Sequence, residues 1–312
     1  MSGQALRIGT RGSPLALAQA KETAARLRAA WPELEPDEAI EIVVIRTTGD
    51  KIRDRPLTEI GGKALFAKEI EAALLDESID VAVHSLKDLP SILPDAFQLA
   101  AVLPREDPRD CLIQAEVRGG LDSLPQGAKV GTCSPRRAAQ LLLHRPDLQI
   151  AELRGNVETR LAKLRDGAMT ATLLGQAGLN RLGMTDIGQT LAPEVFLPAA
   201  TQGAIGLEIR KSDEATAARV APLNDEESWH RSLAERGCLA VLSGSCHTPI
   251  AALAQVDSGH LGLDVLFLLP DGTQPLRRRT LGPLAEAEEL GRTLGEALRA
   301  DSSPAHLALL EA

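Results

Sequence analysis

The chain has 312 residues, of which 44% are hydrophobic, and its formal net charge is -9. This length predicts two or three domains. The acidic balance argues against nucleic acid as the main partner, because nucleic-acid-binding proteins usually carry a basic excess. An anionic ligand would therefore need a local group of cations.

Other classes of protein are disfavoured by the distribution of residues. No apolar run is long enough for a membrane span, and the first residues lack the cationic and apolar segments of a signal peptide. The four cysteines, Cys111, Cys133, Cys238 and Cys246, are widely spaced and form no CxxC pair. We therefore expect no metal site and no disulfide framework, and we expect a cytoplasmic location.

Strand-like and helical patterns alternate over the first two thirds of the chain. Strands are expected at 6–10, 41–48, 79–85, 129–132 and 149–153. Helices are expected from Pro14 and at 63–76, 134–144 and 157–167. Such alternation predicts largely parallel sheets with helices on both faces.

Two proline-rich segments divide this region. The first is 103–110, and the second runs from 196–204 to 220–225. A second α/β lobe is expected between them, and the strand pattern at 203–210 is expected to return to the first lobe. Two lobes joined by a double crossover would enclose a central ligand cleft and could bend at a hinge. The predicted domains are 1–104 with 200–221, then 105–199, and finally 222–312.

The last ninety or so residues have a different pattern. A helix is expected at 227–242, and three strands at 250–256, 260–269 and 276–281 are separated by turn signals. A final helix is expected at 283–300. This predicts a small α+β domain with a three-stranded antiparallel sheet.

The segments "IGTRGSPLALAQ" (8–19) and "VGTCSPRRAAQ" (130–140) resemble each other. In both, a serine, Ser13 or Ser134, is suited to cap a helix whose first residue is proline. Free backbone N–H groups at such helix starts suit an anion. Two ordinary capped helices would give the same pattern.

Cations gather near the expected strand ends. They are Arg11, Lys63, Arg136, Arg137, Arg154, Arg160 and Arg181. Arginine binds carboxylates through two parallel hydrogen bonds, and ligands of α/β sheets bind beyond the carboxyl ends of the strands. Together the cations predict a ligand with several carboxylates, although each one alone would suit an exposed surface.

The stretch "VAVHSLKDLP" (81–90) places Lys87 and Asp88 just after a buried strand. In a cationic cleft Asp88 would stay ionised and could exchange a proton or stabilise a positive charge, with Lys87 as an anion ligand. The alternative is a surface turn with an ion pair. Cys246 lies in the Gly/Ser loop "SGSCHTPI" and is expected to be accessible.

These motifs occur in the order of a known family. The stretches "RIGTRGSPLALAQA", "TTGDK", "DVAVHSLKDLP", "VGTCSPRR", "LRGNVETRLAKL", "QGAIGLE" and "SGSCHTPI" resemble porphobilinogen deaminase, also called hydroxymethylbilane synthase. The resemblance covers about residues 6–250 and implies a three-domain α/β transferase with two lobes like those of periplasmic binding proteins.

The resemblance implies a dipyrromethane cofactor joined by a thioether to Cys246. It makes Asp88 the catalytic carboxylate, which contacts pyrrole nitrogens, assists the loss of ammonia and stabilises the azafulvene cation. Four porphobilinogen molecules would add in turn to the cofactor, and water would release the linear tetrapyrrole hydroxymethylbilane.

The same resemblance assigns the remaining site residues. Cofactor contacts are implied for Ser13, Lys87, Asp88, Ser134, Arg136, Arg137, Arg154 and Gly155. Substrate contacts are implied for Arg11, Ser13, Lys63, Arg154, Arg160 and Arg181. No metal, nucleic acid, membrane or obligate protein partner is expected, and the chain is expected to be a monomer.

The sequence departs from the usual family pattern at Cys133, Pro135, Gly175, Thr201 and 243–245, but none of these changes removes Cys246, Asp88 or the main arginines. Two alternative classes of protein fit part of this pattern. A two-lobed anion-binding protein would explain the cations but would not need Cys246 or Asp88. A regulatory ligand-binding module would need a DNA-binding segment, and no basic helix-turn-helix pattern is present.

Overall fold

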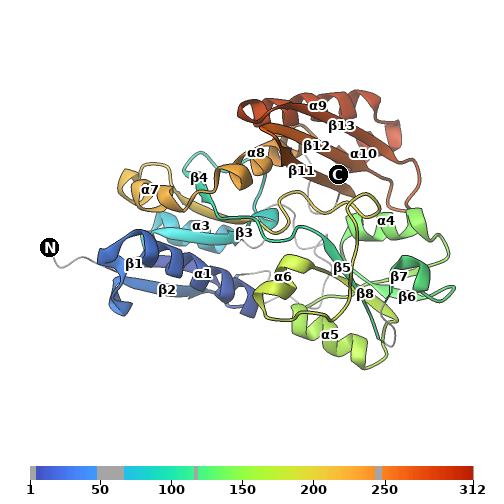
Figure 1. Ribbon diagram of the computed structural model, residues 1–312, viewed down its shortest axis with the longest axis horizontal. Helices are drawn as coiled ribbons and strands as arrows, with labels where there is room; N and C mark the ends of the chain where they lie inside the picture. Colours follow the sequence, from blue (N-terminus) through green and yellow to red (C-terminus); the bar gives the residue numbers. More distant parts are fainter. Residues whose placement is uncertain (1–4, 48–66, 116–118, 243–247, 312) are drawn as a thin grey trace. The chain divides into compact units, whose positions relative to one another are not determined.

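The computed structural model of the protein describes residues 5–47, 67–115, 119–242 and 248–311. The chain divides into two compact units, Met1–Glu106 with Ala204–Trp229, and Asp107–Gly203 with His230–Ala312. The first unit contains one five-stranded sheet, whereas the second contains another five-stranded sheet and a three-stranded one (Figure 1). The domain boundaries drawn from the sequence stay a prediction.

The sheet of the first unit has the strand order β2-β1-β3-β10-β4. Its strands are β1 (Leu6–Arg11), β2 (Ile40–Ile45), β3 (Val81–Ser85), β4 (Phe97–Val102) and β10 (Ile205–Arg210). β1 pairs in parallel with β2 and β3, whereas β10 runs antiparallel to β3 and β4. The expected return of the chain to the first sheet through β10 is confirmed.

Helices cover both faces of this sheet. On one face α1 (Pro14–Ala30) buries Ala20, Ala24 and Leu27 against β1 and β3, and α7 (Glu214–Val220) joins the same core. On the other face α3 (Lys68–Leu75) packs through Ile70 and Leu74. Because β3 is covered on both sides, its residues are apolar almost without interruption.

The first sheet of the second unit has the order β7-β6-β8-β5-β9. Its strands are β5 (Asp110–Gln114), β6 (Lys129–Gly131), β7 (Gln149–Ala151), β8 (Ala171–Gly175) and β9 (Gln189–Thr190). β6 is parallel to β7 and β8, and β5 is antiparallel to β8 and β9. Both lobes therefore place one antiparallel strand in an otherwise parallel sheet. The alternation of strands and helices in the sequence predicted the parallel part of each sheet.

Helix α4 (Pro135–His144) contributes Leu141 to the core on one face of this sheet. On the other face, α5 (Val157–Arg165) and α6 (Gln176–Arg181) contribute Leu164 and Leu179. The helices therefore lie on both faces of the sheet, as the sequence predicts.

The C-terminal part contains the antiparallel sheet β11-β12-β13, formed by Ile250–Asp257, His260–Phe267 and Leu276–Pro283. Ser258 and Gly259, at the turn between β11 and β12, have φ values of 51° and 78°. Positive φ at both central residues is the type I′ geometry that joins strands tightly. The predicted hairpin and the three-stranded sheet are confirmed.

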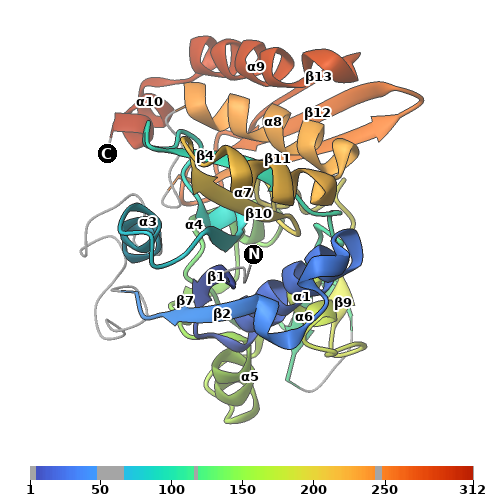
Figure 2. The same ribbon diagram turned by 90° about the vertical axis from the view of Figure 1, so that its left-hand side faces the viewer.

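One face of this sheet packs against helices α8 (Glu226–Val241), α9 (Ala287–Asp301) and α10 (Pro304–Glu311). Helices α8 and α9 run side by side (Figure 2), and a Cβ on Gly291 would lie 2.0 Å from the carbonyl oxygen of Ala234. Residues of the opposite sheet face, Ala251 and Leu253, pack with Ala139 of α4. The C-terminal sheet and the second lobe thus form one compact unit.

Candidate active site

The turn that carries Lys87 and Asp88 is anchored by the leucines on either side. After β3 the chain makes a 3-10 turn, Leu86–Asp88, in which Leu86 is fully buried and its N–H donates to the carbonyl oxygen of Ala204 at 3.0 Å. Leu89, only 5% exposed, closes the turn with a bond to the Leu86 carbonyl. Lys87 and Asp88 are exposed between these two anchors.

Polar contacts fix the end of β3 just before this turn. Ser85 exchanges hydrogen bonds with the side chain of Gln19 on α1, with Nε2 donating at 2.9 Å and Oε1 accepting at 3.1 Å. The ring of His84 is buried and its Nε2 lies 2.9 Å from Oε2 of Glu208 on β10. The backbone beneath Asp88 is therefore held from α1 and from the neighbouring strand.

Arg11 and Ser13 lie at the same edge of the sheet as Asp88. The parallel register pairs Gly9 with Ala82, so the carboxyl ends of β1 and β3 meet. The Ser13 side chain caps α1 by accepting from the N–H of Ala16 at 3.2 Å, as the sequence predicted. In the first unit this edge brings together two predicted cations, a capped helix start and the carboxylate.

In the second unit the carboxyl ends of β6, β7 and β8 carry the corresponding residues. Ser134 caps α4 by accepting from the N–H of Arg137, as predicted. Asn156 caps α5 by accepting from the N–H of Thr159. Gly155 has φ of 117°, and a Cβ there would lie 2.7 Å from the Thr159 side chain. Glycine is therefore required at the start of α5.

Two other predicted arginines of this unit, Arg160 and Arg154, contact the same loops, and a third, Arg181, contacts the segment before β10. Arg160 Nε donates to the Gly155 carbonyl at 2.9 Å, and its Nη2 lies 3.9 Å from Sγ of Cys133. Arg154 Nε is 3.2 Å from a carboxylate oxygen of Glu152. Arg181, on α6, donates through Nη1 to the Gly203 carbonyl at 3.1 Å. All three side chains are partly exposed.

Arg136 and Arg137 differ from the rest because both are buried, with exposed fractions of 5% and 6%. Both contact the carboxylate of Asp110, a fully buried residue on β5 to which the sequence analysis gave no role. Burial by itself would raise the pKa of Asp110, but Arg136 and then Arg137 lower it to about 2. Buried arginines need a counter-charge, which Asp110 supplies. Because the burial of these arginines is not visible in the sequence, no sequence signal singled out Asp110.

The remaining predicted residues, Lys63 and Cys246, lie outside the described residues. Among the described cysteines, burial raises the pKa of Cys111 to about 11 and that of Cys238 to about 12. Neither thiol is therefore available as a thiolate at neutral pH. Cys133 is half-buried, and its Sγ donates to the Leu153 carbonyl.

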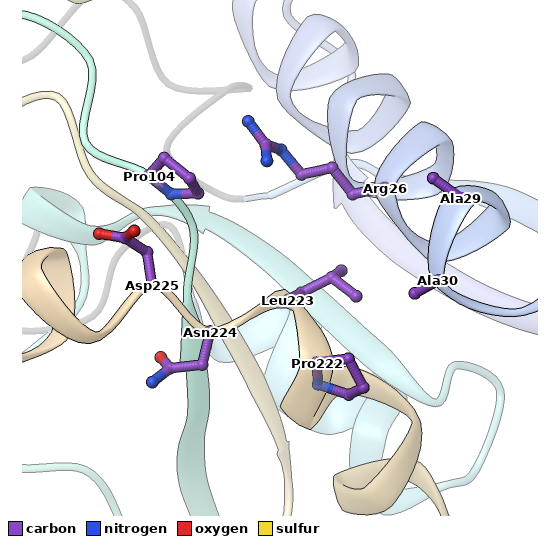
Figure 3. A pocket seen from close by; sticks show the side chains of 8 residues that line it. All are labelled: Arg26, Ala29, Ala30, Pro104, Pro222, Leu223, Asn224 and Asp225. Atoms are coloured by element: carbon purple, nitrogen blue, oxygen red, sulfur yellow. The ribbon is translucent and has the colours of Figure 1, made fainter.

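A surface pocket of about 340 Å³ lies elsewhere in the first unit (Figure 3). It is lined by the end of α1, including Arg26, and by the segment from Pro222 to Asp225. None of the predicted site residues that the structure describes lines it. In the part of the chain that the structure describes, no group of three His, Cys, Asp or Glu residues could hold a metal ion, and no helix is long and apolar enough to cross a membrane.

The fold and these residues define a class of α/β protein with two mixed-sheet lobes, each of which presents cations and a capped helix start at a carboxyl edge. Comparison with known proteins identifies the family. Residues 6–218 match the profile described as "Porphobilinogen deaminase, dipyromethane cofactor binding domain", and residues 229–300 match "Porphobilinogen deaminase, C-terminal domain". The chain belongs to the porphobilinogen deaminase family.

Relatives support this assignment over nearly the whole chain. Porphobilinogen deaminase of Paracoccus denitrificans is 51% identical over 94% of this chain and 93% of its own length. The chloroplastic porphobilinogen deaminase of Oryza sativa is 46% identical over 96% of this chain and 84% of its own. The periplasmic VFT2 domain of Bordetella pertussis BvgS is 13% identical, with a TM-score of 0.40 over 70% of this chain and 86% of that domain. That structural likeness is too weak to carry an argument.

Proposed function

We propose that this chain joins four porphobilinogen molecules head to tail on a dipyrromethane primer and releases hydroxymethylbilane by hydrolysis. Membership of the family over both matched regions supports the overall reaction. The observation that carries the assignment of the site is the anchored turn, which presents Asp88 to solvent at the edge shared by Arg11 and Ser13.

The residues present suit the cofactor that the family profile names. When bound, dipyrromethane supplies a pyrrole ring whose open carbon accepts the first substrate. Its acetate and propionate groups need cations and N–H donors, which the capped start of α4 and the arginines around it provide. Nε of Arg136 is buried without a hydrogen-bond partner, which leaves it as a donor for an anionic group of the cofactor.

Asp88 acts on the substrate. Porphobilinogen carries an aminomethyl group on its pyrrole ring, and once this group is protonated its C–N bond breaks, with the electron pair leaving on nitrogen, which departs as ammonia. The lone pair of the ring nitrogen delocalises the positive charge, and the carboxylate of Asp88 accepts a hydrogen bond from the ring N–H and stabilises that charge. The open pyrrole carbon at the end of the growing chain then attacks the cationic carbon, and the proton on the attacking carbon is lost.

The cations hold the carboxylates of the growing chain. We assign cofactor contacts to Ser13, Lys87, Ser134, Arg136, Arg137, Arg154 and Gly155, and substrate contacts to Arg11, Lys63, Arg154, Arg160 and Arg181. Support comes from the placement of the described members of this set at the carboxyl edges of the two sheets.

We assign the covalent attachment to Cys246. The other three thiols are less suited to the attachment. Cys111 and Cys238 are buried with raised pKa values, and Cys133 donates to a backbone carbonyl. A thioether forms when this sulfur attacks the deaminated carbon of a pyrrole and loses its proton.

A cytoplasmic location and a monomeric state belong to the same proposal. The cysteines that the structure describes are all free thiols, which suits a reducing compartment. Light scattering on a size-exclusion column would give the mass in solution, and a dimer mass would overturn the second point.

The reaction is tested by adding porphobilinogen to the purified chain and measuring ammonia, remaining substrate and linear tetrapyrrole together. We expect one ammonia per porphobilinogen consumed and one tetrapyrrole per four. Binding of porphobilinogen without release of ammonia would instead identify a binding protein.

A further inference from the structure

Asp110 is the first residue of β5 and is fully buried. Its Oδ1 accepts from Nε and Nη2 of Arg137 at 3.0 and 2.7 Å. Nη2 of Arg136 lies 2.8 Å from Oδ2, as an ion pair without the alignment of a hydrogen bond. One carboxylate therefore pairs with two adjacent guanidinium groups, so the three groups together carry a net charge of one positive unit.

Further contacts fix the orientation of both arginines. Nη1 of Arg136 donates to the Leu197 carbonyl at 2.8 Å, and Nη1 of Arg137 donates to the Leu173 carbonyl at 2.9 Å. The guanidinium of Arg136 also lies 5.9 Å from the centre of the Phe196 ring. Each planar group is thus held by at least two contacts, with Asp110 common to both.

Asp110 is in turn held by Gln202. Nε2 of Gln202 donates to Oδ1 of Asp110 at 3.1 Å and to the Pro108 carbonyl at 2.7 Å. A Cβ at Gly175 would lie 3.3 Å from Cδ of Gln202, which is tighter than an ordinary contact. The glycine that departs from the usual family alanine therefore leaves room for this side chain.

We propose that Asp110 is a positioning residue that orients the guanidinium groups of Arg136 and Arg137 toward the carboxylates of the dipyrromethane cofactor, and that Gln202 secures Asp110. This inference rests on the proposed function. Asp110 itself touches no ligand, because it is enclosed between the arginines, the backbone and Gln202. The charge left over on the three groups keeps the site attractive to an anion.

The test compares cofactor loading in the folded fraction of purified variants. Asp110→Asn keeps the shape of the side chain but removes its charge. Loss of a hydrogen bond to a charged group changes an equilibrium about tenfold or more. We therefore expect the ratio of loaded to unloaded chains, measured by intact mass on the monodisperse fraction, to fall about tenfold or more.

Asp80→Asn is the matched control. Asp80 also serves two arginines, Arg7 at 2.7 Å and Arg210 at 3.7 Å, but it lies in the first unit. This variant loses comparable ion pairs and is expected to stay fully loaded. If the two variants lost melting temperature equally and also lost cofactor loading equally, the role of Asp110 would be merely structural. That result would overturn the inference.

Gln202→Leu decides the matter if Asp110→Asn does not fold. It removes one hydrogen bond from Asp110 without changing charge, and we expect a smaller loss of loading, about threefold to tenfold. Full loading of this folded variant would overturn the inference while leaving the proposed function intact. A wild-type chain without any dipyrromethane would refute the proposed function itself.

Discussion

The side chain of Asp88 is exposed, whereas the two leucines around it are buried. Its carboxylate can therefore change without loss of core packing, which makes it suitable for a substitution that reports on chemistry alone. The turn itself stays in place through the backbone bond from Leu86 to Ala204.

We expect Asp88→Asn to lower the rate of ammonia release roughly 10²- to 10⁴-fold, because an amide can neither stabilise positive charge nor exchange a proton. The melting temperature should stay unchanged. Asp95→Asn, at another exposed carboxylate after the same strand, is the control and should keep the wild-type rate. An unchanged rate in Asp88→Asn would remove Asp88 from the mechanism.

His306 is a residue whose protonation should affect stability. It is 3% exposed, the centre of its ring lies 4.6 Å from that of Phe267 with the planes tilted by 59°, and its Nε2 has no hydrogen-bond partner. Burial lowers its pKa below the ordinary value of 6.5, partly offset by a backbone contact with Gln274. The unfolded chain therefore binds the proton more readily than the folded protein.

The contribution of neutral His306 to the stability of the folded state is therefore fully present above about pH 6.5, and it is lost as the pH falls below that value. We expect the melting temperature of the wild type to decrease between about pH 6.5 and 5 more steeply than that of His306→Leu. His260, which is exposed, provides the control substitution. If the melting temperatures of the wild type and His306→Leu decreased equally with pH, the protonation of His306 would not affect stability.

At the scale of elements, α8 and α9 approach each other through glycines. Gly291 faces the Ala234 carbonyl so closely that a methyl group has no space. We expect Gly291→Ala to lower the free energy of unfolding by about 1–3 kcal/mol, since overpacking outweighs the better helix propensity of alanine. Glu296→Ala, an exposed change on α9, should lie within about 0.5 kcal/mol of the wild type in urea unfolding. A more stable Gly291→Ala variant would contradict the packing described.

The elements with clear periodicity could be predicted from the sequence, and those set by pairing could not. The pattern of "LRIGT" and the Ser13-Pro14 cap predicted β1 and α1 because both signals are local. β4 and β5 were missed because they border the proline-rich segment 103–110 and are stabilised by antiparallel partners distant in sequence. The helix predicted from Pro283 begins at Ala287, because Pro283 still belongs to β13.

The candidate site shows the same division. Cations and caps were visible as residue types, and their carboxyl edges followed from the alternation of strands and helices. Burial was not visible, so Arg136 and Arg137 could not be distinguished in the sequence from the more exposed Arg154 and Arg160. Asp110 and Gln202 were overlooked because their roles depend on contacts between residues 27 to 92 positions apart.

At the scale of the whole molecule, the two crossover segments are bonded to each other. The N–H of Leu103 donates to the Ile205 carbonyl at 3.0 Å, and Gln202 donates to the Pro108 carbonyl at 2.7 Å. We expect movement of the lobes, as the chain elongates, to change the hydrogen-exchange protection of Leu103 in successive enzyme–substrate intermediates. The amide of Leu207, within β10, is the control for a strand that keeps its pairing. Identical protection of Leu103 throughout would count against lobe movement.

The covalent attachment of dipyrromethane to Cys246 is tested most directly by the intact mass of the purified chain, measured beside Cys246→Ser. We expect the wild type to exceed its polypeptide mass by one dipyrromethane and the variant to have no excess. A wild type with the bare polypeptide mass that gains nothing on addition of porphobilinogen would show that no such cofactor is attached.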